Sequence, residues 1–560
     1  MPPYKLLHGK TTGTVPTKTA AKNGFGFFGR MFELKDDLVS HIPPGNSTKE
    51  SEKALLELAN AMVETDNAPN TDNPKIPAGY TYFGQFVDHD LTFDPVSSLE
   101  RENDPGQLEN FRTPRFDLDS LYGRGPVATP FLYDAVDNPL KLFVGNGFNH
   151  FSGVETDEDD LPRLIQHPGD ADKEFANERA IAIIGDPRND ENVIVSQIQL
   201  AFIQFHNQII DKLEADNPRV DKGRIFAEAQ ELVRWHYQWV VIHDFLKRIV
   251  DPEIVDSILP KPGSDEIRTK FFNADPPFMP VEFSVAAYRL GHSMVRNKYD
   301  LNQVVRQIPL FSPEGETNRS ADLRGGRRLH LQWTLGWDRF LELDNANPPQ
   351  LSRSLDLKLS IALTQLPGES GDRGILAFLN LLRGWRMGLP SGQAIAKKMG
   401  IEPLPVDWGS DLPSWRNETE EPLWYYILRE AKVLGDGERL GPVGGQIVAE
   451  VFVRLLASDS MSYINVNPNW KPVFPAIGDG FQLRDIVSFD STKLTNKLVV
   501  SDRPVDDDDD EDEYSTGDEH YPTKQKPYPT AWRRPTSQGE SEGQRKRRAH
   551  KWRERRRMTR

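Results

Sequence analysis

The chain has 560 residues, no cysteine and a formal net charge of -16 at pH 7. The lack of cysteine excludes disulfides, thiolate metal sites, iron–sulfur clusters and cysteine nucleophiles, and it leaves the redox compartment open. So negative a net charge argues against nucleic acid as a specific partner of the whole chain. No apolar run approaches the roughly 18–20 residues that span a bilayer.

The first element with a clear pattern is residues 80–90, which predict a helix. Gln85, Asp88 and His89 then share one face at i, i+3 and i+4, while Asp90 is turned away from His89 by about 100°. One face would offer an amide, a carboxylate and an imidazole to a pocket. The simpler interpretation is a polar patch on a surface helix.

Two polar segments follow. TPRFDLDS (113–120) predicts an extended loop whose alternate oxygens suit Ca²⁺, although it lacks the glycine and glutamate spacing of an EF-hand. A self-capping turn rich in aspartate is the alternative. GDPRNDEN (185–192) predicts a turn and then a helix start, where Arg188 and Glu191 could simply form a surface ion pair.

The strongest helical periodicity lies further along the chain, and long Pro/Gly/Asp-rich connections such as 99–160 and 251–280 separate the patterns. Alternating strand patterns are scarce. The fold class is therefore mainly α, with long ordered loops and little sheet. The predicted helices are 196–215, 223–250, 373–388 and 445–458.

Two further polar residues interrupt apolar helices. His292 follows a glycine in AAYRLGHSMV, with Arg289 one turn earlier, and a satisfied core histidine is the alternative to a ligand. Asn380 lies in the apolar stripe of ILAFLNLLRG, one turn before Arg383. A buried asparagine must satisfy its hydrogen bonds, and its carbonyl oxygen could accept one from a histidine N–H.

The composition changes at about residue 501, where an acidic block (506–513) and then a basic block (545–557) leave few apolar residues. We expect residues 1–500 to form the folded domain and 501–560 a disordered tail whose basic block could contact an anionic surface. The first twenty residues lack the apolar stretch of a cleaved secretory signal. A cytoplasmic location and export by another route both stay open.

Together and in this order, the polar segments resemble the animal haem peroxidases of the peroxidase–cyclooxygenase superfamily. The resemblance extends over about residues 75–400 and implies a peroxidase-like helical fold that binds haem b. It rests on FGQFVDHDLTF for the distal helix, TPRFDLDSLYG for the calcium loop, PRNDEN for the distal arginine, YRLGH for the proximal histidine and LNLLRGWRMGLP for its supporting asparagine.

The resemblance implies a role for each matched residue. His292 would be the axial ligand of haem iron, and Asn380 would hydrogen-bond its other ring nitrogen. His89 would be the distal acid–base catalyst, Arg188 would stabilise negative charge on the departing oxygen, and Gln85 would line the distal pocket.

The remaining matches concern attachment and metal binding. Asp88 and Glu191 correspond to carboxylates that form ester bonds with haem, so covalent haem is expected, and Arg289 and Arg383 to partners of the propionates. The implied Ca²⁺ ligands are Asp90, Thr113, Arg115 through its carbonyl, Asp117 and Asp119.

The implied reaction is reduction of hydrogen peroxide, through a ferryl intermediate, with oxidation of halides, thiocyanate or small phenols. Asn192 replaces the methionine that the myeloperoxidase branch links to haem, which argues against efficient chloride oxidation. Arg289 stands where the fatty-acid dioxygenases have a radical-forming tyrosine, which argues against that activity. The lack of cysteine separates this chain from the disulfide-rich animal members and favours a bacterial one.

Two other functions compete. A His-Asp doublet also occurs in metal-dependent HD phosphohydrolases, but that activity leaves Arg188, Asn380 and the 113–120 segment unexplained. A non-catalytic adhesion protein could retain the peroxidase scaffold. Loss of a site residue would favour such a protein, whereas every matched position carries the expected chemistry.

Overall fold

The computed structural model describes residues 26–501, except 36–37, 65–70, 95–98, 100–101, 150–153, 167–178, 262–265, 313–321, 331, 344–346 and 410–411. The chain divides into two units, residues 1–503 and 504–560. The second unit lies outside the described residues, so the proposed tail from residue 501 onward stays a prediction. Within the described residues, no helix is both long and apolar enough to cross a membrane.

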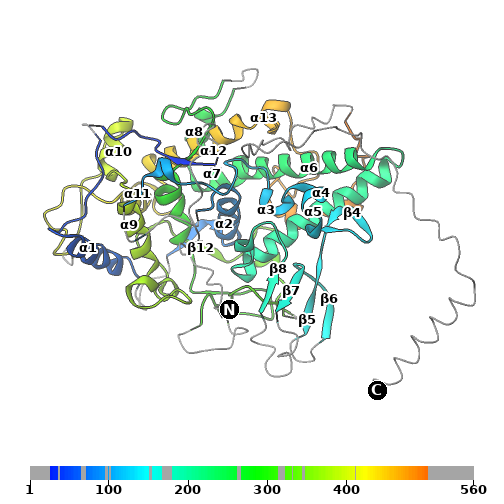
Figure 1. Cartoon of the computed structure of the whole chain (residues 1–560), viewed down its shortest axis with the longest axis horizontal. Helices are drawn as coiled ribbons and strands as arrows, with labels where there is room; N and C mark the ends of the chain where they lie inside the picture. Colours follow the sequence, from blue (N-terminus) through cyan, green and yellow to red (C-terminus); the bar gives the residue numbers. More distant parts are fainter. Residues whose placement is uncertain are drawn as a thin grey trace, which may run out of the picture. The chain divides into compact units, whose positions relative to one another are not determined.

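The architecture is mainly helical, as the periodicity predicts, and the four long helices are all present (Figure 1). Each forms where an apolar stripe recurs at helical spacing and can be buried against another helix. The α-helices are α1 Thr48–Ala61, α2 Gly79–Leu91, α3 Asp119–Tyr122, α4 Gly125–Ala128, α5 Val193–Asp216, α6 Lys222–Trp239, α7 Leu246–Ile249, α8 Pro252–Ile258, α9 Leu376–Arg386, α10 Gly392–Met399, α11 Leu423–Gly435, α12 Pro442–Ser458, α13 Tyr463–Val466 and α14 Leu483–Val487.

Strands within the described residues form only two-stranded sheets. One pair is parallel, β1 (Phe28–Gly29) with β9 (Met279–Pro280). The antiparallel pairs are β2 (Asp72–Pro77) with β12 (Leu351–Arg353), β3 (Tyr133–Asp134) with β4 (Asn138–Leu142), β5 (Gly145–Asn149) with β6 (Val154–Asp160), β7 (Arg163–Gln166) with β8 (Arg179–Ala182), and β10 (Lys298–Tyr299) with β11 (Ile308–Pro309).

Two predicted helices are less regular than their sequences suggest. The predicted helix at 223–250 contains a π-helical turn, η5 (Val240–Phe245), between α6 and α7. The segment that carries His292 is a π-helix, η6 (Glu282–Ala286), followed by a 3-10 helix, η7 (Ala287–His292). Ala286, at φ -127°, is both the last residue of η6 and the N-cap of η7. With three residues per turn in η7, the side chains of Arg289 and His292 project from the same side.

An aromatic core holds α2 in place. α2 packs against α5, and α5 packs in turn against α6 (Figure 1). Phe86 of α2 stacks on Phe202 of α5 at 4.9 Å between ring centroids, and the edge of Tyr237 from α6 meets both rings. Such pairs contribute about 0.5–1.5 kcal/mol each beyond their buried area. The polar residues of α2 therefore project from a rigid helix.

Candidate active site and cation site

Three consecutive residues of α2 have different surroundings. Asp88 is partly buried, whereas His89 and Asp90 are 3% and 0% exposed. Thr92 donates a hydrogen bond to the Asp88 carboxylate, His89 contacts Asn189, and Asp90 contacts the 118–120 segment. The divergence expected from helical spacing is thus present, and it places three polar groups in three environments.

His89 is oriented by an amide chain from the 187–190 turn. Its Nδ1 lies 2.8 Å from the Oδ1 of Asn189, whose Nδ2 donates to the Oε1 of Gln199 at 2.8 Å. Because Asn189 presents its oxygen, the contact requires a proton on Nδ1 of His89. The basic lone pair of the imidazole then resides on Nε2.

Arg188 lies beside His89 and is fixed by Asp186. Its guanidinium bonds both carboxylate oxygens of Asp186, and its Nη2 donates to the His89 carbonyl oxygen at 2.9 Å. Its Cζ also stands 4.6 Å from the centroid of the Phe93 ring. Arg188 is the second residue of the short 3-10 helix η4 (Pro187–Asp190), for which Asp186 is the N-cap. His89 and Arg188 are therefore held together by contacts between segments that are far apart in sequence.

Glu191 and Gln85 meet at the junction of α2 with α5. Gln85 donates from Nε2 to Oε2 of Glu191 at 3.0 Å and accepts from Nδ2 of Asn192 at 3.1 Å. Asn192 is also the N-cap of α5 and accepts from the backbone N–H groups of Ile194 and Val195. Burial raises the pKa of Glu191 to about 7, with Arg188 opposing the shift. The predicted ion pair of Arg188 with Glu191 is absent, because Arg188 bonds to Asp186 instead.

Asp88 lies within the electrostatic influence of both halves of the site. Burial raises the pKa of its carboxyl, and Arg188 on the distal side and Arg289 on the proximal side both oppose that rise. The Tyr288 hydroxyl donates to the Gly84 carbonyl at 3.2 Å, so η7 and α2 are in direct contact. The distal and proximal segments therefore belong to one site.

His292 and Asn380 are in contact, as their sequences suggest. Nδ2 of Asn380 lies 2.7 Å from Nδ1 of His292, and Oδ1 of Asn380 accepts from Nη1 of Arg289 at 3.0 Å. This polarity is opposite to the expected one, in which the amide oxygen accepts from the histidine. The physical reason is that Arg289, which can only donate, occupies the amide oxygen.

Arg289 and Arg383 bring two buried positive charges together. Burial, and then the nearby Arg383, lowers the pKa of Arg289 to about 10. Burial also lowers the pKa of Arg383, whose Nη1 is 3.5 Å from Asp94. The charge of such a pair is stabilised by anions bound nearby. The pair therefore suits a ligand that brings carboxylates into the protein.

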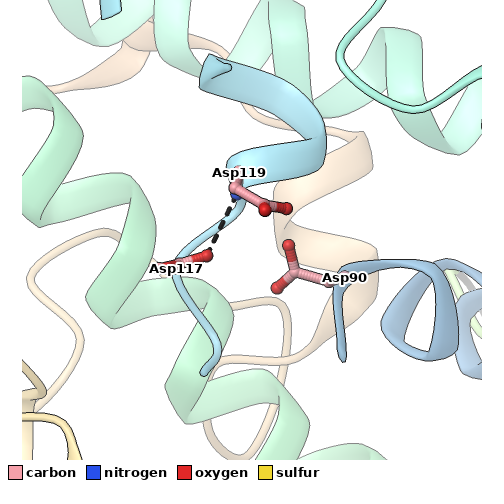
Figure 2. Close-up of side chains that lie close together, drawn as sticks. All are labelled: Asp90, Asp117 and Asp119. Atoms are coloured by element: carbon pink, nitrogen blue, oxygen red, sulfur yellow. Dashed lines mark hydrogen bonds between the residues drawn. The ribbon is translucent and has the colours of Figure 1, made fainter. Parts of the chain in front are cut away.

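Three aspartates form an acidic cluster at the C-terminal end of α2. One carboxylate oxygen from each of Asp90, Asp117 and Asp119 lies within 4.8 Å of the others (Figure 2). Burial and the neighbouring aspartates raise the pKa of Asp90 well above its usual value and that of Asp119 to about 7. Hard carboxylate oxygens at this spacing suit a divalent cation such as Ca²⁺, which would remove the repulsion.

Two further residues of the predicted cation loop are Thr113 and Arg115. Thr113 donates to Oδ2 of Asp117 at 2.7 Å, so its hydroxyl lies at the cluster. The backbone N–H of Arg115 donates to the Thr113 carbonyl at 2.8 Å. The segment is not extended as predicted, because it bends at 114–117 and Leu118 adopts a left-handed conformation (φ 57°).

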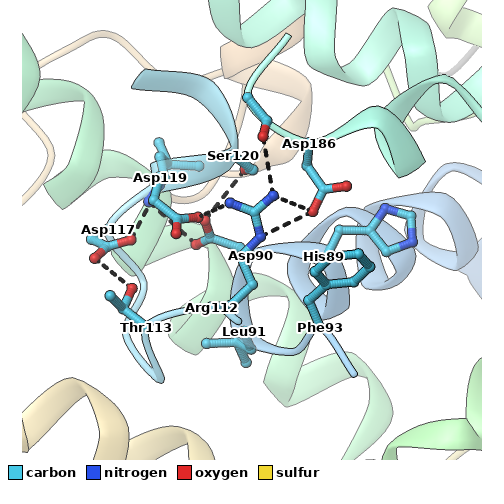
Figure 3. A network of polar contacts seen from close by, with 12 residues as sticks. His89, Asp90, Leu91, Phe93, Arg112, Thr113, Asp117, Asp119, Ser120 and Asp186 are labelled. Carbon is cyan, nitrogen blue, oxygen red and sulfur yellow. Dashed lines mark hydrogen bonds and ion pairs between the residues drawn. The ribbon is translucent and has the colours of Figure 1, made fainter. Parts of the chain in front are cut away.

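Three contact residues have no assigned role in the sequence-based prediction: Arg112, Asp186 and Asn189. Figure 3 shows Arg112 between Asp119 and Asp186, with His89 beside Asp186. Arg112 directly precedes the calcium-loop motif, and the other two lie within GDPRNDEN. The sequence could have drawn attention to these three residues, because each is charged or carries an amide and lies in or next to a motif. Residue spacing could not show which side chain each of them contacts.

The chain is similar in structure or in sequence to several known proteins. The solved structure of peroxidase A from Dictyostelium discoideum matches with a TM-score of 0.54 at 16% identity, over 78% of this chain and 88% of that one. The chorion peroxidase of Drosophila melanogaster is 26% identical over 294 residues, which are 50% of this chain and 34% of that protein. Human thyroid peroxidase is 23% identical over 433 residues, 64% of this chain and 44% of that protein. The chain thus spans less than half the length of both relatives.

The structural match defines a peroxidase-like helical fold. The family model for animal haem peroxidase matches residues 99–404, which is more than half of the chain. The chain therefore belongs to the animal haem peroxidase family. The matched region includes the cation loop, Arg188, Glu191, His292 and Asn380, whereas α2 with His89 precedes it.

Proposed function

We propose that the protein is a haem peroxidase that reduces hydrogen peroxide and oxidises small donors, such as bromide, iodide, thiocyanate or phenols. The contact of Arg188 and Asn189 with His89 carries this proposal, because it presents a basic imidazole nitrogen and a guanidinium together. Family membership supports haem as the cofactor. Bound haem supplies the iron whose redox chemistry joins peroxide reduction to donor oxidation.

The chain's own groups fit a haem. His292 offers an imidazole beside the Asn380 amide, and once that amide turns over so that its oxygen accepts from Nδ1, Nε2 would be the nitrogen that binds the iron. Arg289 and Arg383 supply buried positive charge for the two propionates. Asp88 and Glu191 supply carboxylates suited to ester attachment, and their raised pKa values show that neither charge is well compensated by protein alone.

On the distal side, each residue has a distinct task. His89 takes a proton from peroxide at Nε2 while Asn189 keeps the other proton on Nδ1, and it later returns that proton to the departing oxygen. Arg188 stabilises the negative charge on that oxygen, because Asp186 and the His89 carbonyl keep its guanidinium in place. Gln85, held by Glu191 and Asn192, lines the same pocket and helps hold water or a halide.

We also propose that Asp90, Thr113, Asp117, Asp119 and the Arg115 carbonyl bind Ca²⁺. The acidic cluster supports this proposal, because its three carboxylates converge, with Asp90 buried and the other two partly buried. An ion held by Asp90 would also brace α2 next to His89.

The test is the absorption spectrum of protein produced with haem supplied. We expect a Soret band that partly survives extraction with acidified solvent, which would indicate covalent haem. His292→Ala should lose the axial coordination of the iron and so shift the band, and His89→Ala should retain the band but react with peroxide about 10²–10⁴-fold more slowly. Bromide, thiocyanate and guaiacol turnover would identify the donor class. A wild-type protein that binds no haem would overturn the proposal.

A further inference from the structure

Arg112 connects the acidic cluster with the segment that carries Arg188. Its Nη1 bonds Oδ1 of Asp119 at 2.9 Å, and its Nε and Nη2 bond Oδ2 of Asp186 at 3.0 and 2.5 Å (Figure 3). Only 11% of its side chain is exposed. Charge-assisted pairs of this kind fix geometry more strongly than neutral hydrogen bonds do. Arg112 is therefore a rigid link between two carboxylates.

Asp186 is the carboxylate that Arg112 and Arg188 share. Arg188 bonds it from Nη2 at 2.7 Å and from Nε at 3.1 Å, and the Asp186 side chain is 1% exposed. Its two arginine partners hold the pKa of Asp186 well below its usual value, so it stays charged. The direction of the Arg188 guanidinium consequently depends on a carboxylate that Arg112 also holds.

Backbone packing joins the same two segments independently. A methyl group placed on Gly185 would lie 2.6 Å from the carbonyl oxygen of Ser120 and 2.8 Å from that of Asp119. Arg112 also donates from Nη2 to the Gly185 carbonyl at 3.1 Å. The turn before Arg188 therefore rests directly on the start of α3, and a shift of Asp119 would be transmitted to that turn.

We propose that Arg112 is a positioning residue that couples cation binding at Asp90, Asp117 and Asp119 to the orientation of Arg188. This inference rests on the proposed function, since it assumes a cation in the cluster and a haem ligand beside Arg188. An ion would hold the Asp119 carboxylate in place. Arg112, which bonds both carboxylates, would then hold Asp186 at a fixed position relative to Asp119. Without the ion, carboxylate oxygens of Asp90, Asp117 and Asp119 would lie within 4.8 Å of one another with no cation between them, and their repulsion would loosen the link.

The test compares cyanide binding to the haem-loaded protein, followed by the Soret band, with and without Ca²⁺. In the wild type we expect calcium removal to weaken cyanide binding about five- to tenfold, the lower part of the usual range for coupled sites. Arg112→Gln should bind cyanide weakly in both conditions, with less than about a twofold calcium effect. Reciprocity requires that cyanide tighten Ca²⁺ binding in the wild type by the same factor, measurable by calorimetry.

Two variants guard against a merely structural effect. Arg112→Lys keeps the positive charge but lacks the planar guanidinium whose three nitrogens bond Asp119 and Asp186 at fixed directions, so it should lose the coupling while folding normally. Arg248→Gln is the matched control, because Arg248 also bridges two carboxylates, Asp244 and Glu342, at the other end of α2. It should retain the full calcium effect.

The outcomes separate the two proposals. Normal haem and calcium binding, with an equal calcium effect on cyanide in wild type and both Arg112 variants, would overturn the coupling alone. Loss of the effect in Arg248→Gln as well would also overturn it, since general loosening would then suffice. A wild-type protein that binds no haem would overturn the proposed function and the coupling together.

Discussion

Asn189 determines which ring nitrogen of His89 can act as a base. Its amide cannot turn over freely, because Nδ2 donates to Gln199 while Oδ1 faces the imidazole. An imidazole without this partner would exchange its proton between both nitrogens and lose its fixed direction. At the scale of single residues, the proposed catalysis would thus depend on an amide of the PRNDEN motif to which the resemblance assigns no role.

Asn189→Leu should slow the reaction with peroxide while leaving haem in place. We expect roughly a tenfold loss or more, which is smaller than the roughly 10²–10⁴-fold loss expected for His89→Ala. Stopped-flow absorption at the Soret band measures the rate, and the resting spectrum reports the iron environment. Asn207→Leu is the control, because it removes a partly buried amide of α5 that bonds the Leu142 backbone. An unchanged peroxide rate in Asn189→Leu would refute the role of Asn189.

Asn380 faces two neighbours that compete for its oxygen. The amide oxygen accepts from Arg289, so its Nδ2 faces His292. Iron binding at Nε2 of His292 requires a proton on Nδ1, and therefore an acceptor at Asn380. We infer that the amide turns over and Arg289 releases it when haem binds. Arg289 would then be available to a propionate.

Asn380→Asp should remove this competition, because a carboxylate accepts from both Arg289 and His292. We expect haem to bind at least as tightly as in the wild type and the iron reduction potential to fall, since His292 gains anionic character. Asn380→Leu should instead weaken haem binding about 10–100-fold. Spectroelectrochemical titration measures the potential. A potential equal to that of the wild type in Asn380→Asp would contradict the assignment.

At the scale of elements, the periodicity of α2 was sufficient to predict that Asp88, His89 and Asp90 diverge. It could not predict the partners of His89 and Asp90, because Asn189 and the 118–120 segment meet α2 only through tertiary packing. The predicted extended loop at 113–120 was wrong for a local reason, since Leu118 adopts a left-handed conformation that its side chain does not favour. The sequence was sufficient to predict the long helices. It was not sufficient to predict which group donates and which accepts in a contact such as that of Asn380 with His292.

The junction of α2 with α5 predicts a pH effect on the haem-free protein. The folded state holds the Glu191 proton more tightly than the unfolded state, because burial raises the Glu191 pKa from 4.5 to about 7. Stability should therefore fall as pH rises from about 4.5 to about 7. Glu191→Gln lacks this loss and should be more stable than wild type at pH 8, on the order of 1–3 kcal/mol.

Urea unfolding at pH 4, 6 and 8 tests this expectation. The stability difference between Glu191→Gln and wild type should be small at pH 4 and should grow up to about pH 7. Glu402→Gln, at an exposed position, is the control and should show no such growth. A constant difference across the pH range would mean that the Glu191 carboxylate is compensated in the folded protein.

At the scale of the whole molecule, the cation site joins segments from three parts of the chain. Asp90 ends α2, Asp117 and Asp119 lead into α3, and α6 closes the cluster by its side chains. From α6, Tyr237 donates to Asp90, Arg234 to the Asp117 carbonyl and Gln238 to the Phe116 carbonyl. Removal of an ion from this place should loosen the packing of all three segments.

Calcium should therefore stabilise the folded protein globally. A ligand at 100 times its dissociation constant adds about 2.7 kcal/mol, so chelation should lower the melting temperature by several degrees and increase hydrogen exchange in 86–92 and 113–122. Asp90→Asn should lower the melting temperature in calcium and abolish the response to chelation, because it removes one of three converging carboxylates. Asp211→Asn, at an exposed ion pair of α5, should keep the full response. If chelation changes neither the melting temperature nor the exchange of the wild type, the cluster does not hold Ca²⁺, and the raised pKa values of Asp90 and Asp119 mean that the cluster retains protons in its place.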